Sequence, residues 1–441
     1  MRRVLTVVSI IVLAVSIGNT GAGRTLAAPA PAALTGVDHL DPDFGDHGVV
    51  RLSEPGSSVN FLDFALQPDG NIVVAGEFQN SLLVARYTPS GTLDASFGGT
   101  GIVTTTIGTS SSFATTVMIQ PDSKILVGGS ASDDIALARY SAAGILDTSF
   151  GGTGVVTASI RPESSDTVAA LAIQPDGKIV VACSTSSTRF GDALFVARYT
   201  SSGALDTSFS GGIASANLTY DIFQRTGMAI QPDGRIVVAG KSGSAMAVSR
   251  LTSAGARDSS FGLEGVATTD SGPDTFAYAD ALALQPDGKI IAAGRLLING
   301  PPTFFALARY TSTGAPDLSF GDGGKVLTAM NTGDNQASAL ALLPDGKIVA
   351  GGMSSTFCTS VCDWRFALAR YQPDGRLDRS LGGAGSITSD LFGRLAAVAI
   401  QPDGKFVAVG ATISIFGQPT VALLARFVDD ADAIFLPLAR R

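Results

Sequence analysis

The chain has 441 residues, a formal net charge of −8 and only 15% charged residues. Its Lys and Arg residues form no basic stripe, which excludes nucleic acid as an expected partner. The only histidines are His39 and His47, close to each other near the N-terminus. No Ser–His–Asp set, zinc site or phosphate-binding loop can be assembled from the sequence motifs.

The first 30 residues have the pattern of a secretion signal. Residues 1–3 give a basic start, and residues 4–17 form an apolar run shorter than the roughly 20 residues that a membrane-spanning helix needs. Cleavage is expected between residues 22 and 30, followed by a short linker over 31–39. We therefore expect a secreted or cell-surface protein that is monomeric and has no transmembrane segment in its mature form.

A tight-turn tetrapeptide recurs seven times in the same local context. Five copies read QPDG, the second reads QPDS and the sixth reads LPDG. The copies occupy residues 67–70, 120–123, 174–177, 231–234, 285–288, 343–346 and 401–404. The steps between them are 53, 54, 57, 54, 58 and 58 residues. A period of this size, with an apolar run on each side of the turn, predicts an array of small β-sheets.

The fifth repeat, residues 281–328, shows the predicted unit. Residues 281–284 (ALAL) and 289–294 (KIIAAG) are apolar strands joined by the QPDG turn, whose Pro and Gly suit a tight reversal. Residues 305–310 (FALARY) form the third strand. After a TSTG turn, the fourth strand is expected over residues 315–328. Each repeat is thus a four-stranded antiparallel meander.

The first three strands of each repeat are apolar on both faces, so each sheet must be covered on both sides. Radial packing of the sheets achieves this and leaves only short edges. The sequence therefore predicts an all-β fold, a seven-bladed β-propeller. The first strand is expected innermost because six of the seven repeats carry Ala two residues before the turn motif. The alternative, a β-solenoid, usually has coils of about 20–30 residues.

The two ends of the chain complement each other. The seventh repeat contains its turn and Arg426 but lacks the L-D-x-S-F-G segment that follows in the other repeats. A matching segment stands at residues 40–50, so the N-terminal strand is expected to complete the last blade. The propeller then covers residues 40–428. The tail, 429–441, ends in Leu-Pro-Leu and two arginines, which suggests an address or an anchor, or else an ordinary docked tail.

An Arg on the third strand stands eight residues before an Asp on the fourth in six repeats. A short turn between these strands places each Arg opposite its Asp, so the pairs are interpreted as structural, each worth about 0.2–1 kcal/mol. The predicted pairs are Arg86–Asp94, Arg139–Asp147, Arg198–Asp206, Arg250–Asp258, Arg309–Asp317, Arg370–Asp378 and, across the closure, Arg426–Asp41. One Phe per repeat is expected to pack between blades: Phe44, Phe97, Phe150, Phe209, Phe261 and Phe320.

The motifs A-L-x-QPDGK-I-V-V-A-G and A-R-Y-x-x-x-G-x-L-D-x-S-F-G resemble the bacterial delta-60 repeat family over about residues 40–427. Departures are Ser123 at a turn glycine, Leu343 at a turn Gln, Leu381 at a Phe position, and a one-residue deletion at 209–213. Ser123 is expected to cost about 1 kcal/mol. The resemblance implies an exported propeller, and it supplies no catalytic residue to transfer.

Strand direction sorts the connections onto two faces. The QPDG-type turns and the turns between third and fourth strands lie on one, which we call the turn face. The loops between second and third strands and those between blades lie on the other, the loop face, which holds the variation in length and composition. Its aromatic residues are candidates for stacking on sugars or gripping a peptide, or else they pack on neighbouring loops. The candidates are Phe78, Phe190, Tyr220, Phe276, Tyr278, Trp364 and Phe416.

Acidic residues of the loops between blades could converge near the axis. Carboxylate oxygens are the ligands that Ca²⁺ prefers, although no loop has a regular ligand spacing. The candidates are Asp166, Asp221, Asp274, Asp280 and Asp334. No cofactor is required by any motif, and Ca²⁺ is the one ion that the pattern allows.

The cysteines divide into a close pair and a single residue. Cys358 and Cys362 share a polar loop and are expected to form a disulfide in an oxidising compartment, with two free thiols as the alternative. Cys183 stands where other repeats carry Gly and is expected to be buried and inert.

Three functions remain open. The first is an extracellular scaffold that binds a protein or glycan through the loop face. The second is a lactonase-like hydrolase or a lyase that depends on carboxylates or a metal, an idea that rests on fold analogy. The third is a purely structural surface protein. Because the two histidines, His39 and His47, lie in or beside the closing strand, the sequence favours a protein that is not an enzyme, and no catalytic residue is assigned.

Overall fold

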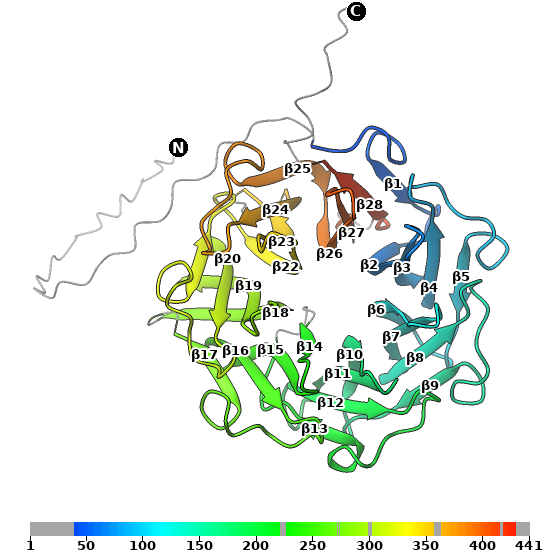
Figure 1. The fold of residues 1–441 in the computed structure, drawn as a ribbon. Coiled ribbons are helices and arrows are strands. Elements are labelled where there is room, and N and C mark those ends of the chain that lie inside the picture. The colour runs from blue at the N-terminus through cyan, green and yellow to red at the C-terminus, as the bar shows by residue number, and fades with distance from the viewer. Residues whose placement is uncertain are drawn as a thin grey trace, which may run out of the picture.

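The computed structural model describes residues 39–220, 226–270, 272, 274–298, 302–356, 363–414 and 418–428. The described residues form seven antiparallel sheets of four strands, arranged as blades around one axis (Figure 1). Their helical content is a single 3₁₀ turn, η1 (Ser210–Gly212), at the predicted one-residue deletion. No helix in these ranges is long and apolar enough to cross a bilayer. The predicted seven-bladed propeller is therefore confirmed.

The strands of the first three blades follow in chain order. Blade 1 contains β2 (Val59–Leu66), β3 (Ile72–Phe78), β4 (Ser81–Tyr87) and β5 (Ile102–Thr105). Blade 2 contains β6 (Ser112–Ile119), β7 (Ile125–Ala131), β8 (Asp134–Tyr140) and β9 (Val155–Ala158). Blade 3 contains β10 (Ser165–Ile173), β11 (Ile179–Ser186), β12 (Ala193–Tyr199) and β13 (Ile213–Ser215).

The remaining blades repeat the same order. Blade 4 contains β14 (Met228–Ile230), β15 (Ile236–Ser242), β16 (Ala245–Leu251) and β17 (Val266–Thr269). Blade 5 contains β18 (Thr275–Leu284), β19 (Ile290–Ile298), β20 (Thr303–Tyr310) and β21 (Lys325–Thr328). Blade 6 contains β22 (Asn335–Leu342), β23 (Ile348–Ser354), β24 (Arg365–Tyr371) and β25 (Ser386–Phe392). Blade 7 contains β26 (Arg394–Ile400), β27 (Phe406–Ala411), β28 (Ala422–Phe427) and β1 (Val49–Leu52).

The first strand of every blade lies nearest the axis, as Figure 1 shows for β2, β6, β10, β14, β18, β22 and β26. The fourth strands lie at the rim. The second and third strands are buried along nearly their whole length, in agreement with their two-sided apolar sequences. Seven hydrophobic clusters fill the seams between adjacent blades.

The fourth strands are shorter than the sequence predicted. In blade 5 only Lys325–Thr328 is a strand, and the L-D-x-S-F-G segment before it is a bend. The Asp317 carboxylate explains this difference, because it accepts hydrogen bonds from the backbone N–H and the hydroxyl of Ser319, at 3.1 and 2.7 Å. Such local bonding draws the backbone out of a ladder.

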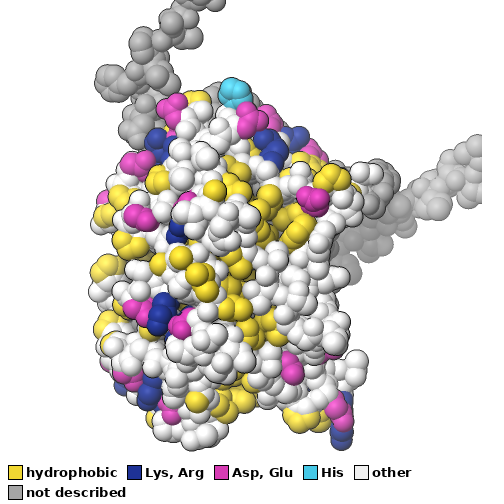
Figure 2. Space-filling model, turned by 90° about the vertical axis from the view of Figure 1, so that its right-hand side faces the viewer, with side chains coloured by type: hydrophobic (Ala, Val, Ile, Leu, Met, Phe, Trp, Pro, Cys, Tyr) yellow, Lys and Arg dark blue, Asp and Glu magenta, His cyan; other side chains and the backbone are white. Residues whose placement is uncertain are grey.

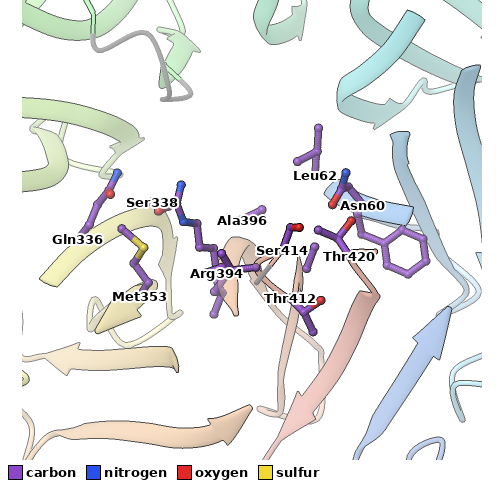
Figure 3. Close-up of a pocket in the computed structure, with 14 residues that line it drawn as sticks. Asn60, Leu62, Gln336, Ser338, Met353, Arg394, Ala396, Thr412, Ser414 and Thr420 are labelled. Carbon is purple, nitrogen blue, oxygen red and sulfur yellow. The ribbon is translucent and has the colours of Figure 1, made fainter. Parts of the chain in front are cut away.

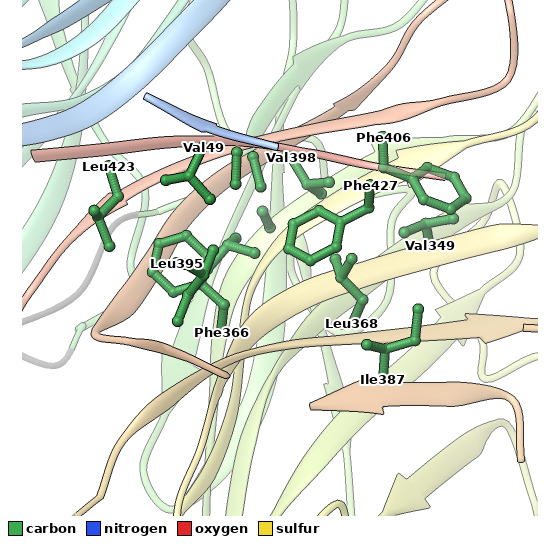
Figure 4. Close-up of a cluster of buried hydrophobic side chains, with 14 of the residues drawn as sticks. Val49, Val349, Phe366, Leu368, Ile387, Leu395, Val398, Phe406, Leu423 and Phe427 are labelled. Carbon is green, nitrogen blue, oxygen red and sulfur yellow. The ribbon is translucent and has the colours of Figure 1, made fainter. Parts of the chain in front are cut away.

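The N-terminal segment lies against the C-terminal strands. β1 pairs antiparallel with β28, and the sheet runs in the order β1-β28-β27-β26. The backbone N–H of Asp41 donates to the carbonyl of Arg426 at 2.8 Å. Figure 4 shows the cluster between blades 6 and 7, where Val49 of β1 packs among side chains of β26 and β28. The paired strand begins at Val49, whereas residue 40 was predicted, because residues 41–48 form the bend that replaces the start of every fourth strand.

Each predicted Arg–Asp pair lies within one blade, with the Arg Nε 2.7–2.9 Å from the Asp Oδ2. In six blades the guanidinium also donates from Nη1 to a backbone carbonyl in the next blade, at 2.5–2.7 Å. The accepting carbonyls belong to Ala142, Ser201, Ser253, Ser312, Pro373 and Pro89. The same guanidinium stacks on the repeat Phe, 4.4–5.0 Å from the ring centre. We call this arrangement the blade staple.

The blade staple is largely buried, as Arg309 and Asp317 illustrate with 5% and 8% exposure. Removing one partner of a buried ion pair costs about 3–5 kcal/mol, because the other charge stays buried without compensation. Loss of either partner alone is therefore expected to cost more than the surface value predicted for a cross-strand pair.

Removing the N-terminal segment should open the ring. A chain without residues 39–52 loses β1, the Asp41 carboxylate and the buried Phe44 ring, and it exposes the edge of β28. We expect aggregation or a large fall in Tm, measured by calorimetry. The matched variant Asp41→Asn removes a single charge and should retain a soluble ring. A truncated chain that melts like the chain that retains residues 39–52 would show that β1 is dispensable.

The backbone of the QPDS turn in blade 2 is strained at its last residue, and a substitution can relieve this strain. Ser123 has φ 66°, in the left-handed region that other turns fill with Gly. Ser123→Gly should raise the free energy of unfolding by about 1 kcal/mol. Gly404→Ser is the reverse control, because Gly404 has φ +85° and no atom within 4 Å of an added Cβ. Urea titration should show free energies of unfolding that shift in opposite directions in the two variants. Shifts of the same sign would show that Ser123 is not strained.

Acid should weaken the blade staples. Burial raises the pKa of Asp378, but hydrogen bonds from Ser380 and Lys347 and the nearby guanidinium outweigh it and lower the value to about 2. The unfolded-state pKa is about 3.9, so the unfolded chain takes up protons first and stability falls with the pH. Tm should drop between about pH 4 and pH 2, and less steeply in Asp378→Asn. A Tm that stays constant between about pH 4 and pH 2 would contradict a stabilising role of the ionised Asp378 in the blade staple.

Candidate functional site

The loop face carries a pocket of about 450 Å³ at the inner end of blades 1, 6 and 7, which we call the mouth pocket. Figure 3 shows Gln336 and Ser338 of β22, Arg394 and Ala396 of β26, and Asn60 and Leu62 of β2 around one opening. Its lining residues are Asn60, Phe61, Leu62, Gln336, Ser338, Met353, Arg394, Leu395, Ala396, Ala411, Thr412, Ile413, Ser414 and Thr420. Three first strands and the loop after β27 therefore converge there.

β-Bulges shape this opening. Six first strands have a register shift that inserts one residue near the loop face. In β2, β22 and β26 the inserted residues are Leu62, Ser338 and Ala396, and all three line the mouth pocket. Bulges bend a strand and re-aim its side chains, and they are over-represented beside functional sites.

The sequence did not predict the bulges, although it contains a signal for them. A Gly near the end of the second strand faces each of these three bulges. A Cβ on Gly76, Gly352 or Gly410 would lie 1.8–2.0 Å from a carbonyl oxygen of the first strand. A Gly inside a strand often marks such a close backbone approach.

Arg394 is the one charged side chain that lines the mouth pocket. Its guanidinium lies 3.9 Å from the ring centre of Trp364, and among the described residues it has no ion-pair or hydrogen-bond partner. Burial of the charge and repulsion from Arg295 hold its pKa below the usual value, and Asp334 opposes this shift. A stacked cation without a bound carboxylate can receive an anionic group.

The other polar groups of the pocket are neutral. Ser338, Thr412, Ser414 and Thr420 supply hydroxyls, and Asn60 supplies an amide. The Gln336 amide already donates to the buried Asp280 carboxylate at 3.0 Å, a bond that links blades 5 and 6. The mouth pocket therefore presents several hydrogen-bonding groups around a single positive charge.

The aromatic candidates lie in different environments. Trp364, Tyr278 and Phe190 stack with cations, Tyr278 between Lys241 and Arg295 at 4.8 and 5.0 Å. Phe190 lies between Arg161 and Arg189, and Phe276 is 54% exposed. Phe78 and Tyr220 pack against the hydrophobic clusters between blades. Phe416 lies outside the described residues.

The acidic candidates do not converge on one point in the described residues. Asp166 is buried and accepts hydrogen bonds from Ile160 N–H and Ser164 Oγ, both at 2.6 Å, which makes it a loop anchor. Asp274 is exposed and Asp334 half-buried, in blades 5 and 6. No group of three or more acidic, His or Cys side chains able to hold a metal occurs in the described ranges. Asp221 lies outside them.

The cysteine predictions have different outcomes. Cys358 and Cys362 lie outside the described residues, so their disulfide stays a prediction. Cys183 is a free thiol that is fully buried, and burial raises its pKa. Such a thiol is a poor nucleophile.

The rest of the surface offers weaker candidates. Figure 2 shows the rim on the side of blades 1 and 2, where charges of both signs are scattered among uncharged side chains. A larger groove of about 780 Å³ lies between the turns of blades 2 and 3. It is lined by the repeated motif itself, including Pro121, Pro175 and the staple residue Arg139. Residues that recur in every blade for packing give this groove no specificity of its own.

Six stretches of the chain match the model of a family described as a domain of unknown function (DUF5122), β-propeller. The matches cover residues 67–97, 120–150, 174–209, 231–261, 285–320 and 343–381. The sequence is thus similar to a propeller repeat family along six of its seven repeats. No curated protein sequence matches this chain.

Several solved structures resemble the chain. Virginiamycin B lyase from Staphylococcus aureus has a TM-score of 0.44 and 9% identity, covering 86% of this chain and 98% of that one. A glucose dehydrogenase has a TM-score of 0.41 and 12% identity, with coverage of 86% and 98%. Drosophila Plexin A, in complex with Semaphorin 1b, has a TM-score of 0.40 and 10% identity, with coverage of 86% of each chain. Likenesses at this level carry no argument about function.

Proposed function

We propose that this chain is an exported scaffold of the delta-60 repeat type that binds a ligand, a glycan or a protein, through its loop face. The mouth pocket is the proposed binding site. The observation that carries the proposal is the composition of that pocket, where three blades bring together polar side chains that do not recur from repeat to repeat.

The division of labour between the two faces supports this proposal. On the turn face the blade staples use the Arg, Asp and Ser side chains of the repeat, together with turn carbonyls of the next blade. The loop face has no equivalent repeated network in the part of the chain that is described. Binding residues are concentrated where a rigid scaffold holds variable segments. The mouth pocket combines the bulged ends of three strands with the loop after β27.

The shape and chemistry of the mouth pocket favour a glycan over a protein. Small-ligand sites are concave and span about 300–1,000 Å³, whereas a stable protein interface buries about 800 Å² on each partner. Hydroxyl and amide groups such as those of Ser414, Thr420 and Asn60 match the donors and acceptors of a saccharide. A protein ligand that inserts one polar side chain remains the second candidate.

Blocking the pocket tests the proposed function. The purified mature chain should bind members of a glycan array, and Ser414→Trp should weaken that binding at least about tenfold by filling the pocket. Ser414 is exposed, so the added ring need not disturb a strand. Ser242→Trp is the matched control, because Ser242 is exposed at the loop-face end of β15 outside the pocket.

Two outcomes would contradict the proposal. One is a mature chain that binds no glycan on the array and retains no partner protein, which would favour a purely structural role. The other is equal loss of binding in Ser414→Trp and Ser242→Trp, which would place the binding site elsewhere on the loop face.

A further inference from the structure

Strand register identifies one set of positions that varies from blade to blade. In every blade except the fourth, one residue of the first strand between its loop-face end and its bulge is paired with a defined residue of the second strand. This partner comes directly after the Gly that faces the bulge, or after Cys183 in blade 3. The pairs are Asn60–Glu77, Phe113–Ser130, Thr167–Ser184, Tyr278–Arg295, Gln336–Met353 and Arg394–Ala411. In the fourth blade the corresponding pair is Thr219 with Lys241.

We call the residues of these seven pairs the mouth positions. Their chemistry differs from blade to blade, although the strands that carry them repeat. The last three residues of each first strand, next to the turn, are small or apolar in every blade. Gln336 has a structural role among the mouth positions, because its amide donates to Asp280 of blade 5. The Arg394 guanidinium stacks on Trp364 and lines the mouth pocket, so its position can contribute to recognition.

The charges at the mouth positions are mostly positive. Lys241, Arg295 and Arg394 belong to blades 4, 5 and 7, and one carboxylate, Glu77, belongs to blade 1. The three cations lie over aromatic rings, Lys241 and Arg295 over Tyr278 and Arg394 over Trp364. An aromatic ring orients a cation but leaves its positive charge in place.

Arg365 offers an instructive contrast on the same face. Its guanidinium binds the carboxylates of Asp363 and Asp390, at 2.9 and 2.6 Å, so its charge is compensated. In the described part of the chain no carboxylate lies within ion-pair distance of Arg394. The two residues therefore differ in their partners: Arg365 is paired with carboxylates, and Arg394 is stacked on an aromatic ring.

We propose that the mouth pocket binds a sugar that carries a carboxylate, with Arg394 pairing the carboxylate. This inference rests on the proposed function and specifies its ligand class. A guanidinium presents two parallel N–H donors that match the two oxygens of a planar carboxylate. The neighbouring Ser338, Ser414 and Asn60 supply hydrogen-bonding partners for the hydroxyls of the sugar ring.

The indole ring of Trp364 orients the Arg394 guanidinium for a bound carboxylate. Stacking on Trp364 restricts the plane of the Arg394 guanidinium, so less freedom is lost when a carboxylate binds. Lysine at this position would keep the positive charge but lose the fork and the stacking geometry. Charge alone therefore does not define the proposed site.

The experiment uses the mature chain and trisaccharides of galacturonate, glucuronate and mannuronate, each compared with its neutral methyl ester by calorimetry. At least one acid should bind about tenfold or more tightly than its ester. Arg394→Met should abolish this preference, and Arg394→Lys should keep only part of it. Arg365→Met is the matched control and should leave the preference unchanged. Equal Tm values would establish that the variants are folded.

The alternative outcomes are distinct. If acid and ester bind equally and Ser414→Trp blocks both, the proposed function stands and the carboxylate proposal fails. If none of the three acids binds, the carboxylate proposal is wrong. A tripeptide with a free C-terminal carboxylate provides the last arm, and its binding in place of the sugars would assign the site to a peptide and overturn the sugar proposal.

Discussion

The fold depends on a guanidinium that bonds to two blades at once. In blade 5 the Arg309 side chain pairs with Asp317 in its own sheet and donates to the carbonyl of Pro373 in blade 6. Hydrophobic packing alone would fill the seams without fixing the angle between neighbouring sheets, because it is not directional. The directional bonds of the staple supply that angle, and their repetition lets seven similar sheets close on one another.

This division of structural work leaves the loop face free to vary. The staples, the turn prolines and the turn glycines all lie at one end of the blades, and the seam clusters fill the middle. At the other end the first strands bulge, and the residues around each bulge differ from blade to blade. The repeat thus fixes the position of the mouth residues while their identity can change, which is the arrangement expected of a binding scaffold.

Periodicity predicted the architecture because the residues that build it recur seven times. The turn motif, the two-sided apolar strands and the Arg–Asp spacing each repeat, and together they defined blades, faces and pairing. The bend at Asp317 and the bulges at Leu62 and Ser338 were missed, since each arises from a local competition for backbone hydrogen bonds that the hydrophobic pattern does not report. The importance of Arg394 was also missed, because a single unrepeated Arg has no periodic signal and only the structure brings it beside Asn60 and Ser414.

Hydrogen–deuterium exchange tests the coupling between blades most directly. In Arg309→Met the amides of the Asp317 bend should exchange faster, and so should those around Gly375 in the next blade, whose turn contains the Pro373 carbonyl that Arg309 binds. Amides of blade 2, which shares no contact with this staple, should keep their exchange rates. Faster exchange in blade 5 alone, with blade 6 unchanged, would show that the guanidinium stabilises only its own sheet and would contradict the account.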